Sequence, residues 1–539
     1  MPTEQMKKQS RWIVGIALFG VLIYLVSTAK GIGIGGDATI YLTSARHLVE
    51  GEGLGLIGPQ GEFRLLPYFP PFFPLVISLF IAFGVDGVMA AHLLNGICFG
   101  LIIWLTGWVT LRASRSLWLA ALAALLAALS PVLIPVYSWA MSEPLAILLG
   151  FGALSVLLDY FEEPAKKSNL VISALLAGLS LLTRYSSAAF LGAWALLVLF
   201  CAPGKARERM ESALVYGLIG SLPIWGWIFY DLSQTASVAS RSVEQGAGLT
   251  QRLADFGANL REVLLFWFIP DSWIASPPYP AVFNTAIIAA ALMGMAALVV
   301  LGLRKMNRSD CSMLRRLVLG LLVFCGLYSG LILLVALTTY PPITIGSRMF
   351  SPVHLAFVWL VVLLVGVLSV INASSQAAMK SVGLAVLCLL AGWYGLRSLR
   401  IVQQNFAEGL GYQSLAWINS ETMRAVKDLP AGQLIVTNEE TAILFLSGRA
   451  SYPLQEIYAN SPDVSPARYG DGNLEEDPAE KLFRDGKALL VVFDSLPKQV
   501  AGLYGDQAES WAAGLTEGLE VIYQAEDGAI YRYRSEPIW

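Results

Sequence analysis

The stretch GGDATIYLTSARHLVEGEGL, residues 35–54, decides how this chain is organised. It follows a long apolar run and places a single carboxylate, Asp37, at the start of an amphipathic segment. An isolated acid beside an apolar run is conspicuous here, because only 14% of the residues in the chain are charged. Asp37 is therefore the first candidate for a chemical role.

The amphipathic segment predicts a helix over residues 38–50. Its spacing puts Tyr41 on an apolar face and puts Thr39 and His47 on the opposite, polar face. A helix of this kind is expected to lie in the membrane interface. Asp37 at its start also has a structural explanation, as an N-cap that accepts hydrogen bonds from backbone N–H groups.

The composition indicates a polytopic membrane protein, because 56% of the 539 residues are hydrophobic and the mean hydropathy is +0.62. Runs of about twenty apolar residues are long enough to cross the hydrocarbon core as helices. The sequence predicts eleven such spans, at residues 12–29, 87–110, 117–137, 143–160, 169–183, 186–202, 212–230, 281–303, 317–338, 351–371 and 380–397. The expected fold class is an all-α polytopic membrane protein with a separate C-terminal domain.

Basic residues predict the orientation, because Lys and Arg in short loops stay on the cytoplasmic side. Basic clusters precede the first span and follow the second, fourth, sixth and eighth spans. All of them are cytoplasmic if the N-terminus is cytoplasmic and the apolar segment at residues 72–83 does not cross. That segment overlaps YFPPFFP, residues 68–74, and is predicted to form an interfacial or re-entrant helix.

The chain divides into a membrane domain, residues 1–400, with an exterior loop at 30–74, and an extracytoplasmic domain, residues 401–539. The second domain contains 10 Lys and Arg against 21 Asp and Glu, a net charge of −11, which leaves +8 for the first. LIVTNEETAILFLSG at 434–448 predicts a strand followed by a helix, and KALLVVFDS at 487–495 predicts a second buried strand. With a later helix and hairpin, these segments predict a small α/β domain.

Three further charged residues lie at the exterior ends of spans. Glu143 in YSWAMSEPL begins a predicted helix, where an acid beside Pro144 is also a common structural device. Arg184 in LLTRYSS and Arg348 in TIGSRMFSPVH lie on the exterior side, against the positive-inside bias. A guanidinium near hydrocarbon requires a partner. That partner is either a phosphate, which matches the guanidinium fork, or a salt bridge to Glu143 or Asp37.

No pattern of metal ligands stands out, because the five cysteines all precede residue 401 and none forms a CxxC pair. No metal site is therefore predicted, although a divalent metal stays open. The glycine-rich segment GIGIGG, residues 31–36, follows a membrane helix and not a strand. That context favours a flexible exit from the membrane over a nucleotide-binding loop.

Several short motifs share one predicted membrane side and follow one order: Asp37, Tyr41, Ala45, Gly51, Gly53, Pro70, Pro71, Glu143, Arg184 and Arg348. This order resembles the polyprenyl-phosphate-dependent glycosyltransferases of the GT-C fold, a superfamily that includes protein O-mannosyltransferases and lipid A aminoarabinose transferases. The resemblance covers about residues 10–370. Members with a KPP sequence carry lysine where this chain has Phe69, so Lys30, Arg46 or Arg64 would have to supply a phosphate contact from that side.

The resemblance implies an inverting glycosyltransferase of the plasma (inner) membrane. It would move a monosaccharide from a polyprenyl-phosphate donor to a hydroxyl of a lipid, glycan or protein acceptor on the extracytoplasmic side. Asp37 would be the general base, Arg184 and Arg348 would bind the donor phosphate, and Glu143 would position the acceptor or tune the site. The residues expected to line the substrate cavity are Tyr41, Tyr68 and His47.

Two other functional classes stay open at this stage. A transporter or flippase of lipid-linked sugars would place polar residues near the bilayer midplane in repeated halves, whereas this chain places its charges at the ends of spans. A silent scaffold would use the exterior domain to bind partners. Membrane lipids are expected partners in each case, and nucleic acid is not.

Overall fold

The structure is a computed structural model that describes residues 4–65, 69–234, 242–243, 248–280, 282–306, 312–340, 343, 345–370, 376–454, 478–504 and 507–533. Its described residues form a large helical part and a smaller part built on a sheet. Tyr68, which the sequence analysis assigned to the substrate cavity, lies outside the described residues.

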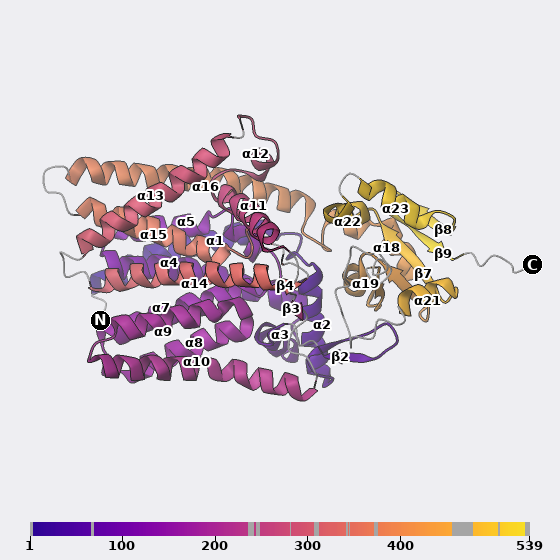
Figure 1. Cartoon of the computed structure of the whole chain (residues 1–539), viewed down its shortest axis with the longest axis horizontal. Helices are drawn as coiled ribbons and strands as arrows, with labels where there is room; N and C mark the ends of the chain where they lie inside the picture. The colour runs from indigo at the N-terminus through magenta and orange to yellow at the C-terminus, as the bar shows by residue number, and fades with distance from the viewer. Residues whose placement is uncertain are drawn as a thin grey trace, which may run out of the picture.

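Long helices lie roughly side by side in the helical part (Figure 1). Seven of the described helices are long and apolar enough to cross a membrane. They are α1 (Glu4–Ser27), α4 (Gly87–Ser114), α7 (Glu143–Glu162), α10 (Ala206–Gln234), α13 (Val282–Met306), α14 (Ser312–Thr338) and α16 (Gln376–Glu408). The remaining four predicted spans contain shorter apolar helices, namely α5 (Leu117–Ala128), α8 (Lys167–Thr183), α9 (Ala188–Cys201) and α15 (Ser351–Val370). The protein is an integral membrane protein, and the predicted fold class is confirmed.

Short elements connect these helices at the end of the bundle near the sheet (Figure 1). The predicted exterior loop contains α2 (Gly36–Glu50), α3 (Phe72–Ala82) and an antiparallel hairpin of β1 (Gly55–Ile57) and β2 (Phe63–Leu65). The other connecting elements are α6 (Leu133–Tyr137), the 3₁₀ turn η1 (Tyr185–Ser187), β3 (Ser242–Val243), α11 (Leu249–Phe268), α12 (Asp271–Ala275) and β4 (Thr339–Tyr340).

The predicted polar face of α2 is wrong in part. Thr39 and His47 are buried, with 0% and 7% of their surfaces exposed, whereas Val49 is exposed. The reason is that α2 is covered on more than one side, by α3, by the β1–β2 hairpin and by α19 (Glu440–Ser447) of the C-terminal domain. A helix lying free in the interface would have kept one polar face in water.

The C-terminal domain is α/β, as predicted. Its five-stranded sheet has the order β6-β5-β7-β9-β8, in which β5 pairs in parallel with both neighbours and β9 pairs antiparallel. The strands are β5 (Leu434–Thr437), β6 (Tyr452–Pro453), β7 (Ala488–Phe493), β8 (Glu520–Ala525) and β9 (Gly528–Arg532). The helices are α17 (Leu415–Asn419), α18 (Glu421–Asp428), α19, α21 (Pro478–Arg484), α22 (Leu496–Tyr504) and α23 (Ala508–Thr516).

The C-terminal domain sits at one end of the bundle, and the N-terminus lies at the opposite end (Figure 1). Helix α16 continues past residue 400 to Glu408 and carries the chain into this domain. Two hydrogen bonds reinforce the junction. The Tyr412 N–H donates to the Ile34 carbonyl at 2.9 Å, and Gln60 Nε2 donates to the Tyr452 hydroxyl at 2.8 Å. The domain thus rests on α2 and on its hairpin.

Candidate active site

Asp37 lies in the first turn of α2 and does not cap the helix. The N-cap is Gly35, which has extended backbone angles and makes no side-chain capping bond. The predicted capping role of Asp37 is therefore wrong. Its carboxylate, about one-third exposed, instead faces Arg348, whose Nη2 lies 3.1 Å from Asp37 Oδ2.

The glycines before Asp37 allow a close approach of three backbone segments. Gly33 exchanges hydrogen bonds with Ser138 and Ala140, and Ile34 accepts one from the Tyr412 N–H. A Cβ atom on Gly33 would lie 2.7 Å from the Trp139 ring. The glycines therefore serve close packing and not, as predicted, a flexible exit from the membrane.

Arg348 connects two carboxylates. Besides Asp37, it contacts Glu143, with 3.1 Å between Arg348 Nε and Glu143 Oε1. Arg184 lies 3.0 Å from the same oxygen through its Nη1. Asp37, Arg348, Glu143 and Arg184 thus form one continuous series of contacts, which we call the ion-pair chain. The salt bridges that the sequence analysis left open for the two arginines are present.

Local structure explains how the ion-pair chain is assembled. Glu143 is the first residue of α7, where the helix dipole favours a negative charge, and Pro144 follows it in the first turn. Arg184 is the extended residue that ends α8. Arg348 lies three residues before α15. Each charged side chain is thus positioned at or near the end of a helix. The ion-pair chain is built from four segments that lie far apart in the sequence.

Burial differs along the ion-pair chain. The Glu143 side chain is 3% exposed and that of Arg184 is 21% exposed, whereas that of Arg348 is 45% exposed. Among the residues that the structure describes, the second carboxylate oxygen, Glu143 Oε2, has no hydrogen-bond partner. A buried acceptor of this kind can receive a hydrogen bond from a ligand hydroxyl. The ion-pair chain therefore runs from the buried acid Glu143 to the exposed cation Arg348 and to Asp37, which is about one-third exposed.

Ser142 links the ion-pair chain to Tyr41. Arg184 Nη1 donates a hydrogen bond to Ser142 Oγ at 3.0 Å, and the Tyr41 hydroxyl lies 3.3 Å from the same oxygen. Burial raises the pKa of the Tyr41 phenol well above its usual value, so this hydroxyl stays protonated. Tyr41 therefore contributes to the site through its contact with Ser142, which accepts the hydrogen bond from Arg184. The sequence analysis missed Ser142, although its position directly before Glu143 was a usable signal.

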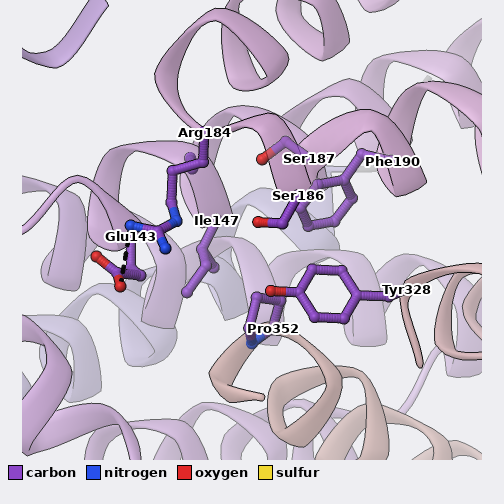
Figure 2. Close-up of a pocket in the computed structure, with 9 residues that line it drawn as sticks. Glu143, Ile147, Arg184, Ser186, Ser187, Phe190, Tyr328 and Pro352 are labelled. Carbon is purple, nitrogen blue, oxygen red and sulfur yellow. Dashed lines mark ion pairs between the residues drawn. The ribbon is translucent and has the colours of Figure 1, made fainter. Parts of the chain in front are cut away.

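A small cavity adjoins the buried end of the ion-pair chain. Figure 2 shows Arg184 reaching Glu143, with Ser186 and Ser187 at one side of the cavity and Tyr328 at another. The Tyr328 hydroxyl donates to the backbone carbonyl of Met349 at 2.7 Å. These hydroxyl residues were not predicted, since tyrosine and serine inside apolar spans carry no distinctive pattern.

Two other predicted residues lie apart from the ion-pair chain. His47 is ten residues beyond Asp37, near the other end of α2, and its Nδ1 lies 2.9 Å from the Gly55 carbonyl. Phe69, the position at which the KPP members of the superfamily that the sequence resembles carry lysine, packs edge-on against Tyr41 with ring centroids 5.1 Å apart. It lines a second small cavity between α2, α3 and α10, together with Tyr41, Pro71 and Trp227.

The donor set of the ion-pair chain does not fit a divalent cation. Each of its two carboxylates is already in contact with a guanidinium, and two acids and two arginines balance in charge. Mg²⁺ and Zn²⁺ sites instead concentrate uncompensated oxygen, nitrogen or sulfur ligands. The arrangement is suited to an anion that competes for the arginines, such as a phosphate.

Comparison with solved structures identifies the class of fold. No protein-family model and no curated protein sequence matches the chain. ArnT from Cupriavidus metallidurans bound to undecaprenyl phosphate is similar with a TM-score of 0.50 and 12% identity, over 97% of this chain and 98% of ArnT. The Archaeoglobus fulgidus oligosaccharyltransferase tethered with an acceptor peptide has a TM-score of 0.52 and 12% identity, over 97% of this chain and 74% of the oligosaccharyltransferase. The archaeal oligosaccharyltransferase AglB from Archaeoglobus fulgidus, in complex with an inhibitory peptide and a dolichol-phosphate, has a TM-score of 0.50 and 12% identity, over 98% of this chain and 75% of AglB.

These similarities extend over nearly the whole chain, including the C-terminal domain. The protein has the GT-C fold of polyprenyl-phosphate glycosyltransferases and oligosaccharyltransferases, which confirms the predicted resemblance at the level of fold. At 12% identity the comparisons do not extend to the sugar or the acceptor.

Proposed function

We propose that the protein is an inverting glycosyltransferase that moves a monosaccharide from a polyprenyl-phosphate donor to an acceptor hydroxyl on the extracytoplasmic side. The single observation that carries this proposal is the ion-pair chain, which gathers two arginines and two acids at one end of an otherwise apolar bundle. The GT-C fold supports it, since ArnT was solved with undecaprenyl phosphate and AglB with a dolichol-phosphate.

In the proposed reaction the acceptor hydroxyl attacks the anomeric carbon of the donor sugar. A bond forms between the acceptor oxygen and this carbon, while the bond from the carbon to the phosphate oxygen breaks. Asp37 removes the hydroxyl proton, and the polyprenyl phosphate leaves with the bonding electrons. Attack from the face opposite the phosphate inverts the configuration.

The two arginines would stabilise the negative charge that develops on the departing phosphate. Arg348 is the more exposed of the two and is shared between Asp37 and Glu143. A phosphate that binds Arg348 would compete with Asp37 for its guanidinium. Donor binding would thereby release the Asp37 carboxylate for proton transfer, which couples the arrival of the donor to the availability of the base.

Glu143 would position the acceptor through Oε2, the buried oxygen that lacks a partner among the described residues. Tyr41 and Ser142 would hold Arg184 in place. The apolar cavity beside Phe69 and Trp227 would receive the start of the lipid chain. Tyr68 lies outside the described residues and stays a prediction for the substrate cavity, whereas His47 is buried near the other end of α2, apart from the ion-pair chain.

The geometry favours a transferase over a transporter or flippase. Glu143, Arg184 and Arg348 lie at or just beyond the ends of α7, α8 and α15. Transporter sites are typically built from broken helices near the bilayer midplane. We further propose that the site faces the extracytoplasmic side of the plasma (inner) membrane, with the N-terminus in the cytoplasm, as the distribution of basic residues predicts.

Replacing Asp37 with asparagine tests the proposal. Asp37→Asn keeps the shape of the side chain but removes the base, so we expect transfer to fall by about 10²- to 10⁴-fold. Transfer is measured in native membranes as the release of undecaprenyl phosphate from a panel of undecaprenyl-phosphate-linked monosaccharides. Binding of undecaprenyl phosphate to the purified variant should persist.

Glu62→Gln is the matched control, because Glu62 is an exterior carboxylate that accepts a hydrogen bond from the Gln60 N–H, away from the ion-pair chain. It should leave transfer unchanged. Wild-type transfer rates in a folded Asp37→Asn protein would refute the assignment of the base.

A further inference from the structure

Three potential metal ligands gather at the C-terminal end of α2. The ligating atoms of His47, Glu50 and Glu52 all lie within 4.8 Å of one another. The helix ends at Gly51, whose φ of 86° turns the chain back on itself. The N–H of Glu52 then donates to the His47 carbonyl at 2.9 Å, which brings the Glu52 side chain beside the imidazole.

The His47 ring is already oriented as a metal ligand requires. Its side chain is buried, and Nδ1 lies 2.9 Å from the Gly55 carbonyl oxygen. A carbonyl can only accept, so Nδ1 carries a proton, and in the neutral ring Nε2 is the nitrogen that has the lone pair for a metal. Nε2 faces Glu52, with 3.9 Å to Oε2. Metal-binding histidines almost always donate their second ring N–H to a carbonyl or carboxylate in this way.

The charge of the cluster also favours a cation. Glu50 and Glu52 are exposed acids held close together beside the His47 imidazole. Within the part of the chain that the structure describes, neither is paired with a lysine or arginine. Two unpaired carboxylates at this distance repel each other, and a divalent cation between them would remove the repulsion.

We propose that His47, Glu50 and Glu52 form a divalent metal site of the zinc type. One imidazole nitrogen and two carboxylate oxygens are common zinc ligands, and water would complete a tetrahedral shell. The site would hold the end of α2 to the loop before β1. The β1–β2 hairpin that follows reaches the C-terminal domain through Gln60 and Tyr452. The metal would therefore stabilise the exterior junction, at the opposite end of α2 from Asp37.

The experiment uses the full-length protein in lipid nanodiscs, stripped with a chelator and titrated with ⁶⁵Zn²⁺ in equilibrium dialysis. The wild type should bind one saturable equivalent per chain, and its melting temperature should rise on binding. The double variant Glu50→Gln/Glu52→Gln changes only exposed residues, so it is expected to fold, and it should lose saturable binding. Glu62→Gln, in the same exterior loop, should bind as the wild type does.

Three results would overturn this proposal. The first is a stripped wild type that takes up no zinc, and the second is a double variant that binds zinc as the wild type does. The third is binding that persists in the double variant but disappears in Asp37→Asn, since it would move the metal to the other end of α2. Each is independent of sugar transfer, so the zinc site and the proposed activity can fail separately.

Discussion

Arg348 is the residue through which the two acids of the site are connected, because its guanidinium contacts both Asp37 and Glu143. Arg348→Gln should weaken the binding of undecaprenyl phosphate by roughly 10- to 150-fold, which corresponds to about 1.5 to 3 kcal/mol for a hydrogen bond to a charged group. Native mass spectrometry of the protein in nanodiscs measures this affinity. Arg424→Gln, which removes an exposed arginine of α18 in the C-terminal domain, is the control, and an equal loss in both variants would argue against a specific phosphate contact.

Glu143 is the most buried member of the ion-pair chain, so its charge should matter for stability as well as for function. Glu143→Gln leaves two guanidinium groups with one carboxylate, and breaking a buried pair in this way typically costs about 3 to 5 kcal/mol. We expect the melting temperature of the variant to be lower than that of the wild type. Undecaprenyl phosphate should raise the melting temperature of the variant more than that of the wild type, because the phosphate replaces the missing negative charge. Equal stabilisation of both proteins by the lipid would contradict this account.

The charged residues of the site could be predicted from the sequence, whereas their hydroxyl neighbours could not. Asp37, Glu143, Arg184 and Arg348 are conspicuous because charges are costly in an apolar chain. Tyr328 and Ser186 are not conspicuous in the sequence, since hydroxyl side chains inside spans usually form hydrogen bonds with the backbone of their own or a neighbouring helix. The sequence left two partners open for the arginines, a phosphate or the two acids. Only the packing of four distant segments shows that the arginines contact the acids.

At the scale of elements, the segment before α2 sets the position of Asp37. Gly33→Ala would place a methyl group 2.7 Å from the Trp139 ring and disturb the backbone pairing of residues 33 and 139. We expect a lower melting temperature and reduced transfer, since Asp37 follows four residues later. Gly15→Ala in α1, where an added Cβ meets nothing within 4 Å, should change neither quantity. A Gly33→Ala protein with the melting temperature and the transfer rate of the wild type would show that the segment tolerates displacement.

The helices of the bundle were predictable because their length and hydropathy are set by the membrane. The environment of α2 was less predictable from the sequence. Its periodicity indicated one buried face, but the hairpin and α19 cover further residues, including Thr39 and His47. Periodicity reports which side of a helix is apolar, and it carries no information about elements such as α19, which packs against α2 from about 400 residues away.

On the scale of the whole molecule, the site lies where the helical bundle meets the C-terminal domain. Helix α19 packs against α2, and a Cβ on Gly36 would lie 3.6 Å from the Thr441 hydroxyl, so the C-terminal domain reaches the residue directly before Asp37. The sequence predicted this domain and its α/β class, but not its docking.

The central claim is that Arg184 and Arg348 bind the phosphate of a polyprenyl carrier beside Asp37. The most direct measurement is a cryo-electron microscopy structure of the protein in nanodiscs with undecaprenyl phosphate. Our account predicts phosphate density within hydrogen-bonding distance of both guanidinium groups, with the Arg348–Asp37 contact lengthened from its present 3.1 Å. Phosphate density at another place on the protein, with the ion-pair chain unchanged, would contradict it.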